Sequence, residues 1–199
     1  MSEAARYDTR FLRNYARSKL ATDPLYAAVT ERLRGATGPI VDVGCGIGLM
    51  AGYLRAEGFE QSIVGIDHDA AKIAHARRAV PSATFEVGDA RDPLPTASTV
   101  LILDVLHYFD DADQSRILAN AARADLVIIR DALGDGTWRH RSTVAVERFA
   151  RRVRWMKADV LNFPARERIV GAFDGFAGSI EPMWGATPFN NYLFVFRRG

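Results

Sequence analysis

The sequence predicts a single α/β domain built on a doubly wound, mostly parallel sheet. Its 199 residues, 48% of them hydrophobic, suit one well-sized core. Short apolar segments alternate along the chain with segments of helical periodicity. The apolar segments lack polar alternation, as expected for strands that are buried on both faces. No repeat or linker divides the chain, so residues 1–199 are expected to form one domain.

Residues 1–36 are predicted to form a helical cap that acts as a lid. Asp23 and Pro24 supply a cap and a first-turn proline, and Gly35 ends the segment. Apolar residues recur there one helical turn apart, at Leu25, Val29 and Leu33.

Beyond the cap, strands and helices are expected to alternate. The predicted strands are residues 40–43, 62–66, 83–87, 100–103 and 126–129, and the predicted helices are 49–57, 70–80 and 111–122. Two further strand-like segments, 177–180 and 192–196, are separated by only eleven residues, two of them prolines. Because so short a connection cannot hold a helical crossover, the last strand is expected to be antiparallel.

The composition excludes several classes of protein. The single cysteine, Cys45, cannot form an internal disulfide or supply a zinc-finger ligand set. No segment resembles a membrane span or a secretory signal, so a cytoplasmic location is expected.

A basic insertion, residues 138–165, is predicted after the fifth strand. Seven cations and one acid lie between residues 138 and 157, although the net charge of the chain is only +2. The spacing of the apolar residues predicts an amphipathic helix with the arginines beside or opposite the apolar stripe, at Arg148, Arg151, Arg152 and Arg154. These arginines form either a solvated face or a site for an acidic carrier protein or an anionic membrane; RNA is disfavoured because no recognisable RNA-binding motif is present.

A glycine-rich turn follows the first predicted strand. Its glycines, Gly44, Gly46 and Gly48, follow Asp42 and enclose Cys45, and the next position is Leu49, which departs from the dinucleotide fingerprint. Asp67 ends the second strand nineteen residues after Gly48, where a carboxylate can accept the hydroxyls of a ribose. Asp89 and Ala90 follow the third strand. Each acid could equally be a helix N-cap.

From residue 40 onward, the chain resembles the class I S-adenosylmethionine-dependent methyltransferases. The resemblance implies a Rossmann-like sheet of seven strands whose last strand is antiparallel, with S-adenosylmethionine as cofactor. It places the methionine part of the cofactor against Asp42 and the glycine turn, the ribose at Asp67, and adenine beside His68, Asp89 and Ala90. Asp104, after the fourth strand, would hold the amino group of the cofactor.

His107 is the candidate catalytic residue of this resemblance. With an ordinary pKa of about 6.5, it suits deprotonating an acidic hydroxyl, although it could also line the pocket without moving a proton. The sequence around Asp104 departs from the motif of nucleic-acid amino-methyltransferases. Asp104 and Asp131 match two positions of a metal-dependent subgroup, but Ala132 replaces the third ligand, so no metal is expected.

The substrate is expected at the carboxyl ends of the parallel strands. Topology brings six candidate substrate residues to this edge: Tyr15, Tyr108, Arg130, Trp138, Trp184 and Asn190. A fainter resemblance, through residues 130–133 and the basic insertion, is to small bacterial methyltransferases of aryl polyene and lipid assembly, and it implies a carrier-bound aromatic substrate.

The sequence therefore predicts methyl transfer to a small or carrier-bound apolar or aromatic acceptor, most simply at oxygen. Two alternatives stay open. One is a non-catalytic cofactor-sensing or RNA-binding module with the same fold. The other is an NAD(P)-dependent reductase, which the glycine spacing and the lack of a substrate domain disfavour.

Overall fold

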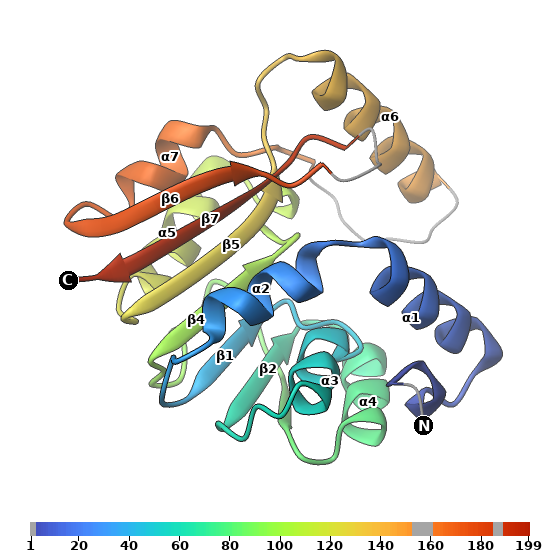
Figure 1. Ribbon diagram of the computed structural model, residues 1–199. Helices are drawn as coiled ribbons and strands as arrows, with labels where there is room; N and C mark the ends of the chain where they lie inside the picture. Colours follow the sequence, from blue (N-terminus) through green and yellow to red (C-terminus); the bar gives the residue numbers. More distant parts are fainter. Residues whose placement is uncertain (1–2, 153–160, 185–188) are drawn as a thin grey trace.

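The computed structural model describes residues 3–152, 161–184 and 189–199. In this part of the chain, seven strands form one sheet in the order β3-β2-β1-β4-β5-β7-β6 (Figure 1). Neighbours from β3 to β5 are parallel, whereas β7 is antiparallel to both β5 and β6. The doubly wound, mostly parallel sheet with an antiparallel last strand is therefore confirmed.

The element bounds agree closely with the periodicity of the sequence. The strands are β1 (Ile40–Val43), β2 (Ile63–Asp67), β3 (Thr84–Val87), β4 (Thr99–Leu103), β5 (Leu126–Ala132), β6 (Phe176–Pro182) and β7 (Asn191–Arg198). The helices are η1 (Glu3–Arg6), α1 (Arg10–Thr22), α2 (Leu25–Leu33), α3 (Leu49–Ala56), α4 (Ala70–Ala79), η2 (Leu106–Tyr108), α5 (Asp111–Ala121), α6 (Trp138–Arg152) and α7 (Arg166–Gly171).

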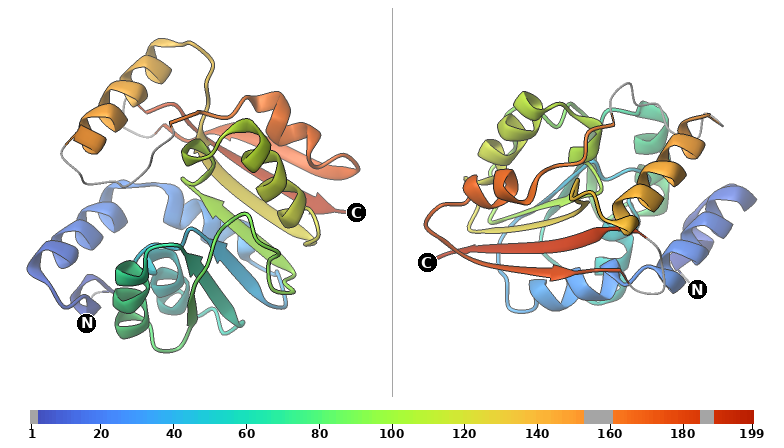
Figure 2. Two further views of the ribbon diagram at one scale, coloured as in Figure 1. Left: turned by 180° about the vertical axis from the view of Figure 1, so that it is seen from behind. Right: turned by 90° about the horizontal axis from the view of Figure 1, so that it is seen from above.

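Helices cover both faces of the sheet and enclose two hydrophobic clusters. One cluster joins α1 to α4 with Leu126 and Ile128 of β5. The other joins α5 and α7 with Val127 and Ile129 of the same strand. The view from behind shows α5 lying across the second face (Figure 2, left). Because both faces are packed, the central strands are apolar throughout, as the sequence indicated.

Strand β5 is three residues longer than the periodicity predicted, and all seven of its residues are buried. Since side chains alternate along a strand, Arg130 continues the face of Ile128, and Asp131 continues the face of Ile129. Two adjacent charged residues therefore lie on opposite sides of the sheet, Arg130 toward the cap and Asp131 toward α5.

The N-terminal cap consists of η1, α1 and α2 and is fastened at both ends. Before α1, the Asp8 carboxylate pairs with His75 (3.0 Å) and Arg78 (2.9 Å) of α4. After α1, the Asp23 carboxylate pairs with Arg130 of β5 (3.0 Å). These contacts hold α1 against the body of the domain at the carboxyl ends of the parallel strands (Figure 1).

Helix α6 begins at Trp138, where the basic insertion was predicted to start. The side chains of Arg148, Arg151 and Arg152, and all of Arg154, lie outside the described part of the chain. Among the described residues, no helix is long and apolar enough to span a bilayer. The extent of the insertion and the single domain over residues 1–199 stay predictions.

Candidate active site

The turn after β1 forms an open backbone cradle. Gly44 and Gly46 have φ angles of 72° and 57°, in the left-handed region that side chains disfavour. A Cβ atom on Gly44 would lie 2.4 Å from Cγ2 of Val105, whereas a Cβ atom on Gly46 would meet nothing within 4 Å. Gly44 is therefore required for packing, and Gly46 borders open space. Gly48, with φ 78°, completes the turn before α3.

Asp67 ties this cradle to the end of β2. Its side chain is buried, Oδ2 accepts a hydrogen bond from the N–H of Gly46 (2.9 Å), and Oδ1 accepts one from the N–H of Asp69 (2.9 Å). A carboxylate has about four acceptor positions, so two remain for the hydroxyls of a ligand. The role of Asp67 as the ribose acceptor stays a prediction.

Asp42 and Cys45 are buried beside the cradle. Burial and the charge of Asp67 raise the pKa of the Asp42 carboxyl to about 7, so protonated and ionised forms coexist near neutral pH. A cationic ligand in the cradle would favour the ionised form. Burial raises the pKa of the Cys45 thiol, which is therefore neutral and lacks the reactivity of a thiolate.

The residues after β3 form a charged cluster at the predicted adenine side. Arg91 donates to both carboxylate oxygens of Asp89 (2.9 and 2.6 Å) and also pairs with Asp113 (3.0 Å). These hydrogen bonds hold the pKa of Asp89 at about 2. Ala90 packs against the hydrophobic cluster that includes α5 and α7, and the His68 side chain is exposed. The Asp89 carboxylate is thus ionised and already bound by Arg91.

A chain of alternating charges joins the cap to the turn after β4. Asp104 has a φ of 61°, and it is the one non-glycine residue with positive φ in the described part of the chain. Nη2 of the buried Arg130 contacts both the Asp104 carboxylate and Oδ2 of Asp23 (3.0 Å), and Lys19 pairs with Asp23 (3.1 Å). Burial opposes the ionisation of Asp23, but Arg130 and Lys19 outweigh it and lower its pKa.

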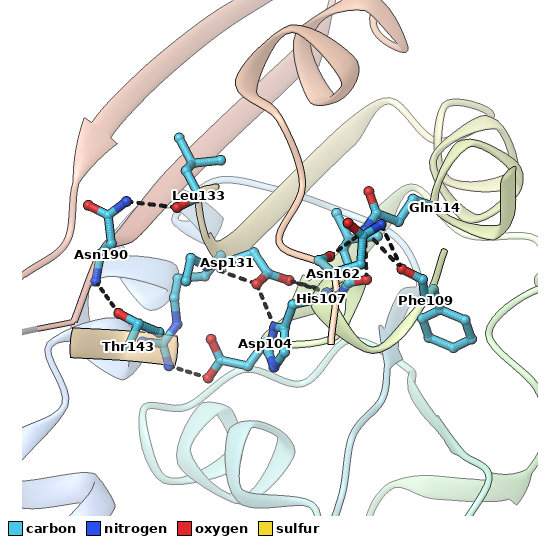
Figure 3. Close-up of polar contacts among 12 residues, drawn as sticks. Asp104, His107, Phe109, Gln114, Asp131, Leu133, Thr143, Asn162 and Asn190 are labelled. Carbon is cyan, nitrogen blue, oxygen red and sulfur yellow. Dashed lines mark hydrogen bonds and ion pairs between the residues drawn. The ribbon is translucent and has the colours of Figure 1, made fainter. Parts of the chain in front are cut away.

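His107 and Asp131 form a buried pair (Figure 3). Nδ1 of His107 lies 2.6 Å from Oδ1 of Asp131, which also accepts from the N–H of Ala132 (2.8 Å). Oδ2 accepts from the backbone N–H of Leu106 (2.8 Å). An ionised carboxylate only accepts hydrogen bonds, so we assign the ring proton to Nδ1, and the basic lone pair of neutral His107 is on Nε2.

Gln114 of α5 holds the loop that carries His107. Its side chain is completely buried, and Nε2 lies within hydrogen-bonding distance of the carbonyl oxygens of Leu106 (3.1 Å), Phe109 (3.0 Å) and Asn162 (2.7 Å). The N–H of Asn162 donates to the carbonyl oxygen of His107 (2.8 Å). The segment that returns from the basic insertion is therefore bonded to the His107 loop (Figure 3).

Aromatic rings surround His107. The Tyr108 ring centroid lies 3.9 Å from that of His107, and Phe163 stacks at 5.6 Å with the planes 21° apart. On the other side of Phe163, His140 makes an edge contact at 5.2 Å and bonds the carbonyl oxygen of Leu133 (2.9 Å). Rings of this kind suit a flat, apolar acceptor.

Tyr15 and Asn190 occupy different surroundings. Tyr15 of α1 lies close enough to the charges of Lys19 and Asp104 for them to affect its ionisation, so the cap brings it to the site. Asn190 is buried, and its side-chain amide donates to the carbonyl oxygen of Leu133 (2.9 Å). Its backbone N–H donates to Oγ1 of Thr143 (3.0 Å), which ties the start of β7 to α6 (Figure 3).

The two predicted tryptophans lie farther out, at the start of α6 and after β6. Trp138 is 57% exposed, and the guanidinium of Arg139 lies over its ring (4.7 Å) and over the ring of Trp184 (4.5 Å). Trp184 also contacts Tyr192 of β7 edge-on. The substrate roles of all six candidate residues stay predictions.

Sequence reasoning missed several residues of this site. Gln114, Asn162 and Phe163 were not candidates, and Asp131 was weighed as a metal ligand but not as a partner of His107. A signal existed for Gln114, because it lies at the spacing of the buried residues Ile117, Leu118 and Ala121 on the same helix face. No comparable pattern marks residues 162 and 163.

Comparisons with known proteins agree with this geometry. Residues 40–124 match a family model described as a methyltransferase domain. No curated protein matches the sequence significantly. Magnesium protoporphyrin IX methyltransferase from Synechocystis, solved with bound SAH, is 18% identical, with a TM-score of 0.68 over 96% of this chain and 89% of its own.

Two further solved structures share the fold. The PH0226 protein of Pyrococcus horikoshii is 18% identical, with a TM-score of 0.68 over 92% of this chain and 91% of its own. An O-methyltransferase family protein from Burkholderia thailandensis is 17% identical, with a TM-score of 0.71 over 92% of this chain and 57% of its own.

The sheet order, the glycine cradle and the family-model match agree with the class I S-adenosylmethionine-dependent methyltransferases, which the sequence resembles. Residues 40–124, which include the cradle, Asp67 and Asp89, match the methyltransferase-domain model, and the chain is an S-adenosylmethionine-dependent methyltransferase. The open backbone at Gly46 and the buried acceptor at Asp67 fit this cofactor.

Proposed function

We propose that the chain methylates a hydroxyl oxygen of a small or carrier-bound aromatic acceptor, with His107 as general base. The observation that carries this proposal is the buried contact between His107 and Asp131 (2.6 Å). It stands at the carboxyl end of β4 and β5, the edge where α/β domains bind their ligands.

The cofactor is assigned to residues of the first four strands and their turns. Asp42 and the glycine turn would hold its methionine part, Asp67 its ribose, and His68, Asp89 and Ala90 its adenine. Asp104 would hold its amino group. When bound, S-adenosylmethionine supplies an electrophilic methyl group on a positively charged sulfur.

Asp131 and His107 have different roles in proton transfer: Asp131 orients the imidazole, and His107 accepts the proton. Asp131 keeps the proton on Nδ1 and stabilises the imidazolium that forms when Nε2 accepts the hydroxyl proton of the acceptor. The Tyr108 and Phe163 rings provide an apolar wall that aligns a flat acceptor and limits access of water. General-base catalysis of this kind contributes about 10²- to 10⁴-fold in rate.

The test compares cofactor binding with turnover. The full chain is titrated calorimetrically with S-adenosylmethionine and S-adenosylhomocysteine and is then assayed by mass spectrometry on free and carrier-bound hydroxylated aromatic acceptors. His107→Ala should lower kcat by about 10²-fold or more, and should change cofactor affinity less than about threefold. In His107→Ala, which lacks the imidazole, the fall of kcat/KM at acidic pH should disappear.

His140→Ala is the matched control, because His140 contacts the other side of Phe163 and bonds a backbone carbonyl. It should keep the fall of kcat/KM at acidic pH. Equal losses of cofactor affinity and turnover in His107→Ala, or unchanged turnover, would remove His107 from the role of base.

A further inference from the structure

The charge of the chain is concentrated on α1 and α6. These two helices hold nine of the cations and a single acid, a formal charge of +8 over 28 residues. Because the net charge is +2, the rest of the chain carries −6. Both helices lie at the end of the molecule where the parallel strands finish, beside the candidate active site (Figures 1 and 2). The positive end of the molecule is therefore also its active-site end.

Exposed arginines on these helices lie beside the candidate active site (Figure 1). Arg10 and Arg17 of α1 and Arg141 of α6 are exposed, and no carboxylate of the described residues lies within ion-pair distance of them. Some exposed arginines elsewhere have acidic partners, as in Arg34–Glu31 and Arg198–Asp125, whereas others, such as Arg123, have none among the described residues. The three arginines thus leave uncompensated positive charge around the site.

Each of the two helices also exposes a large aromatic side chain. Phe11 of α1 is 54% exposed, and Trp138 of α6 is 57% exposed. On α1, Arg10 and Arg17 are exposed on one face two turns apart, and the exposed Phe11 lies one turn before Tyr15 on the adjoining face. On α6, Trp138 shares the solvent face with Arg141. Arginine beside an exposed aromatic ring is the composition of surfaces that enter the headgroup region of a bilayer.

We propose that α1 and α6 dock the active-site end of this protein onto an anionic lipid bilayer. The residues that make the contact are Arg10, Phe11, Arg17, Trp138 and Arg141, here called the docking face. Its arginines pair with lipid phosphates, and its two aromatic rings enter the interface. An acidic protein would satisfy the charges, but two separate exposed rings favour a planar, amphipathic partner.

Vesicle flotation with the full chain tests this proposal. The protein should float with vesicles of phosphatidylcholine containing about 30% phosphatidylglycerol and should stay free with phosphatidylcholine alone. Binding should weaken at least about tenfold between 50 mM and 500 mM salt, because the attraction is screened. Flotation with both kinds of vesicle alike, or with neither, would overturn the proposal. Binding to poly-L-glutamate without flotation would assign the face to an acidic protein instead.

Variants locate the contact on the molecule. Arg10→Glu with Arg17→Glu should weaken vesicle binding at least about tenfold, and Phe11→Ala with Trp138→Ala should weaken it severalfold. The matched controls are Arg123→Glu, at the opposite edge of the sheet before β5, and Val170→Ala on α7, which is 41% exposed. Both controls should bind as the parent chain does. Equal effects of the docking-face and control variants would contradict the proposal. Arg10 and Arg17 are both exposed, so the double variant is expected to fold.

Discussion

Gly44 and Gly46 have similar backbone angles but different neighbours. A methyl group at Gly44 collides with Val105, and a methyl group at Gly46 enters the open space of the cradle. The sequence predicted both glycines as parts of one motif. It could not separate their roles, because the difference depends on Val105, which is 61 positions from Gly44 in the chain.

Alanine substitutions should separate packing from binding. Gly44→Ala should destabilise the fold by about 2–5 kcal/mol, through left-handed strain and overpacking. Gly46→Ala should cost about 1–2 kcal/mol of stability, yet weaken S-adenosylmethionine binding at least about tenfold, because its methyl group occupies ligand space. Urea denaturation and calorimetric titration of both variants measure these effects. Normal cofactor affinity in Gly46→Ala would show that the cofactor does not approach this backbone.

Other residues of the site differ in how far a pattern could reveal them. Asp67 and His107 follow strands and were predicted as candidates, because strand ends meet at one edge of the sheet. The contact of His107 with Asp131 was not predicted. It depends on β5 continuing through Ala132, and a strand that ends in two charged residues looks like a loop in the sequence.

Among the elements, α5 is the support of the catalytic loop. Gln114 is a polar residue on the buried face of α5. Its side-chain amide bonds carbonyl oxygens of the loop after β4 and of Asn162. The segment in turn bonds the backbone of His107. The buried face of α5, where apolar packing is expected, thereby also fixes the position of His107, the candidate base.

Removal of the Gln114 donor should loosen this loop. Gln114→Leu should destabilise the fold by about 1–3 kcal/mol and lower kcat, with the affinity for S-adenosylmethionine little changed. Gln114→Glu should behave similarly, because an ionised carboxylate cannot donate to the carbonyl oxygens.

Ser115→Ala is the control on the same helix, where an exposed hydroxyl bonds the carbonyl oxygen of Asp111. Its stability and kcat should stay near those of the parent chain. Lost stability with an unchanged kcat and pH profile in Gln114→Leu would limit Gln114 to a structural role.

For the whole molecule, the charge chain from Lys19 to Asp104 connects the cap with the sheet. Asp23→Ala should leave Arg130 buried with half of its partners and should cost about 3 kcal/mol, because an uncompensated charge remains inside the protein. Hydrogen exchange should speed up across α1 and α2.

Asp8→Ala serves as the comparison, since Asp8 fastens the other end of α1 from an exposed position. Its effect on exchange should be confined to the start of α1. Unchanged exchange in α2 of Asp23→Ala would mean that the cap is held by its apolar contacts alone.

The order of strands and helices was more predictable from the sequence than the ion pairs that join the cap to the rest of the domain. Apolar runs and helical spacing fix the order of strands and helices, and the short connection before β7 requires an antiparallel strand. The resemblance added the number of strands. By contrast, the ion pairs of Asp8 and Asp23 with α4 and β5 join residues that are about 65 to 110 positions apart, and no local pattern encodes such pairs.

The sheet order also has a consequence for synthesis of the chain. Strand β6 pairs only with β7 among the described strands, and β7 separates it from β5. Until residues 191–198 leave the ribosome, β5 therefore has an open edge and β6 has no partner. The second hydrophobic cluster also lacks the buried ring of Phe194. Folding is expected to be completed only after these residues emerge, and the nascent chain needs protection from aggregation until then.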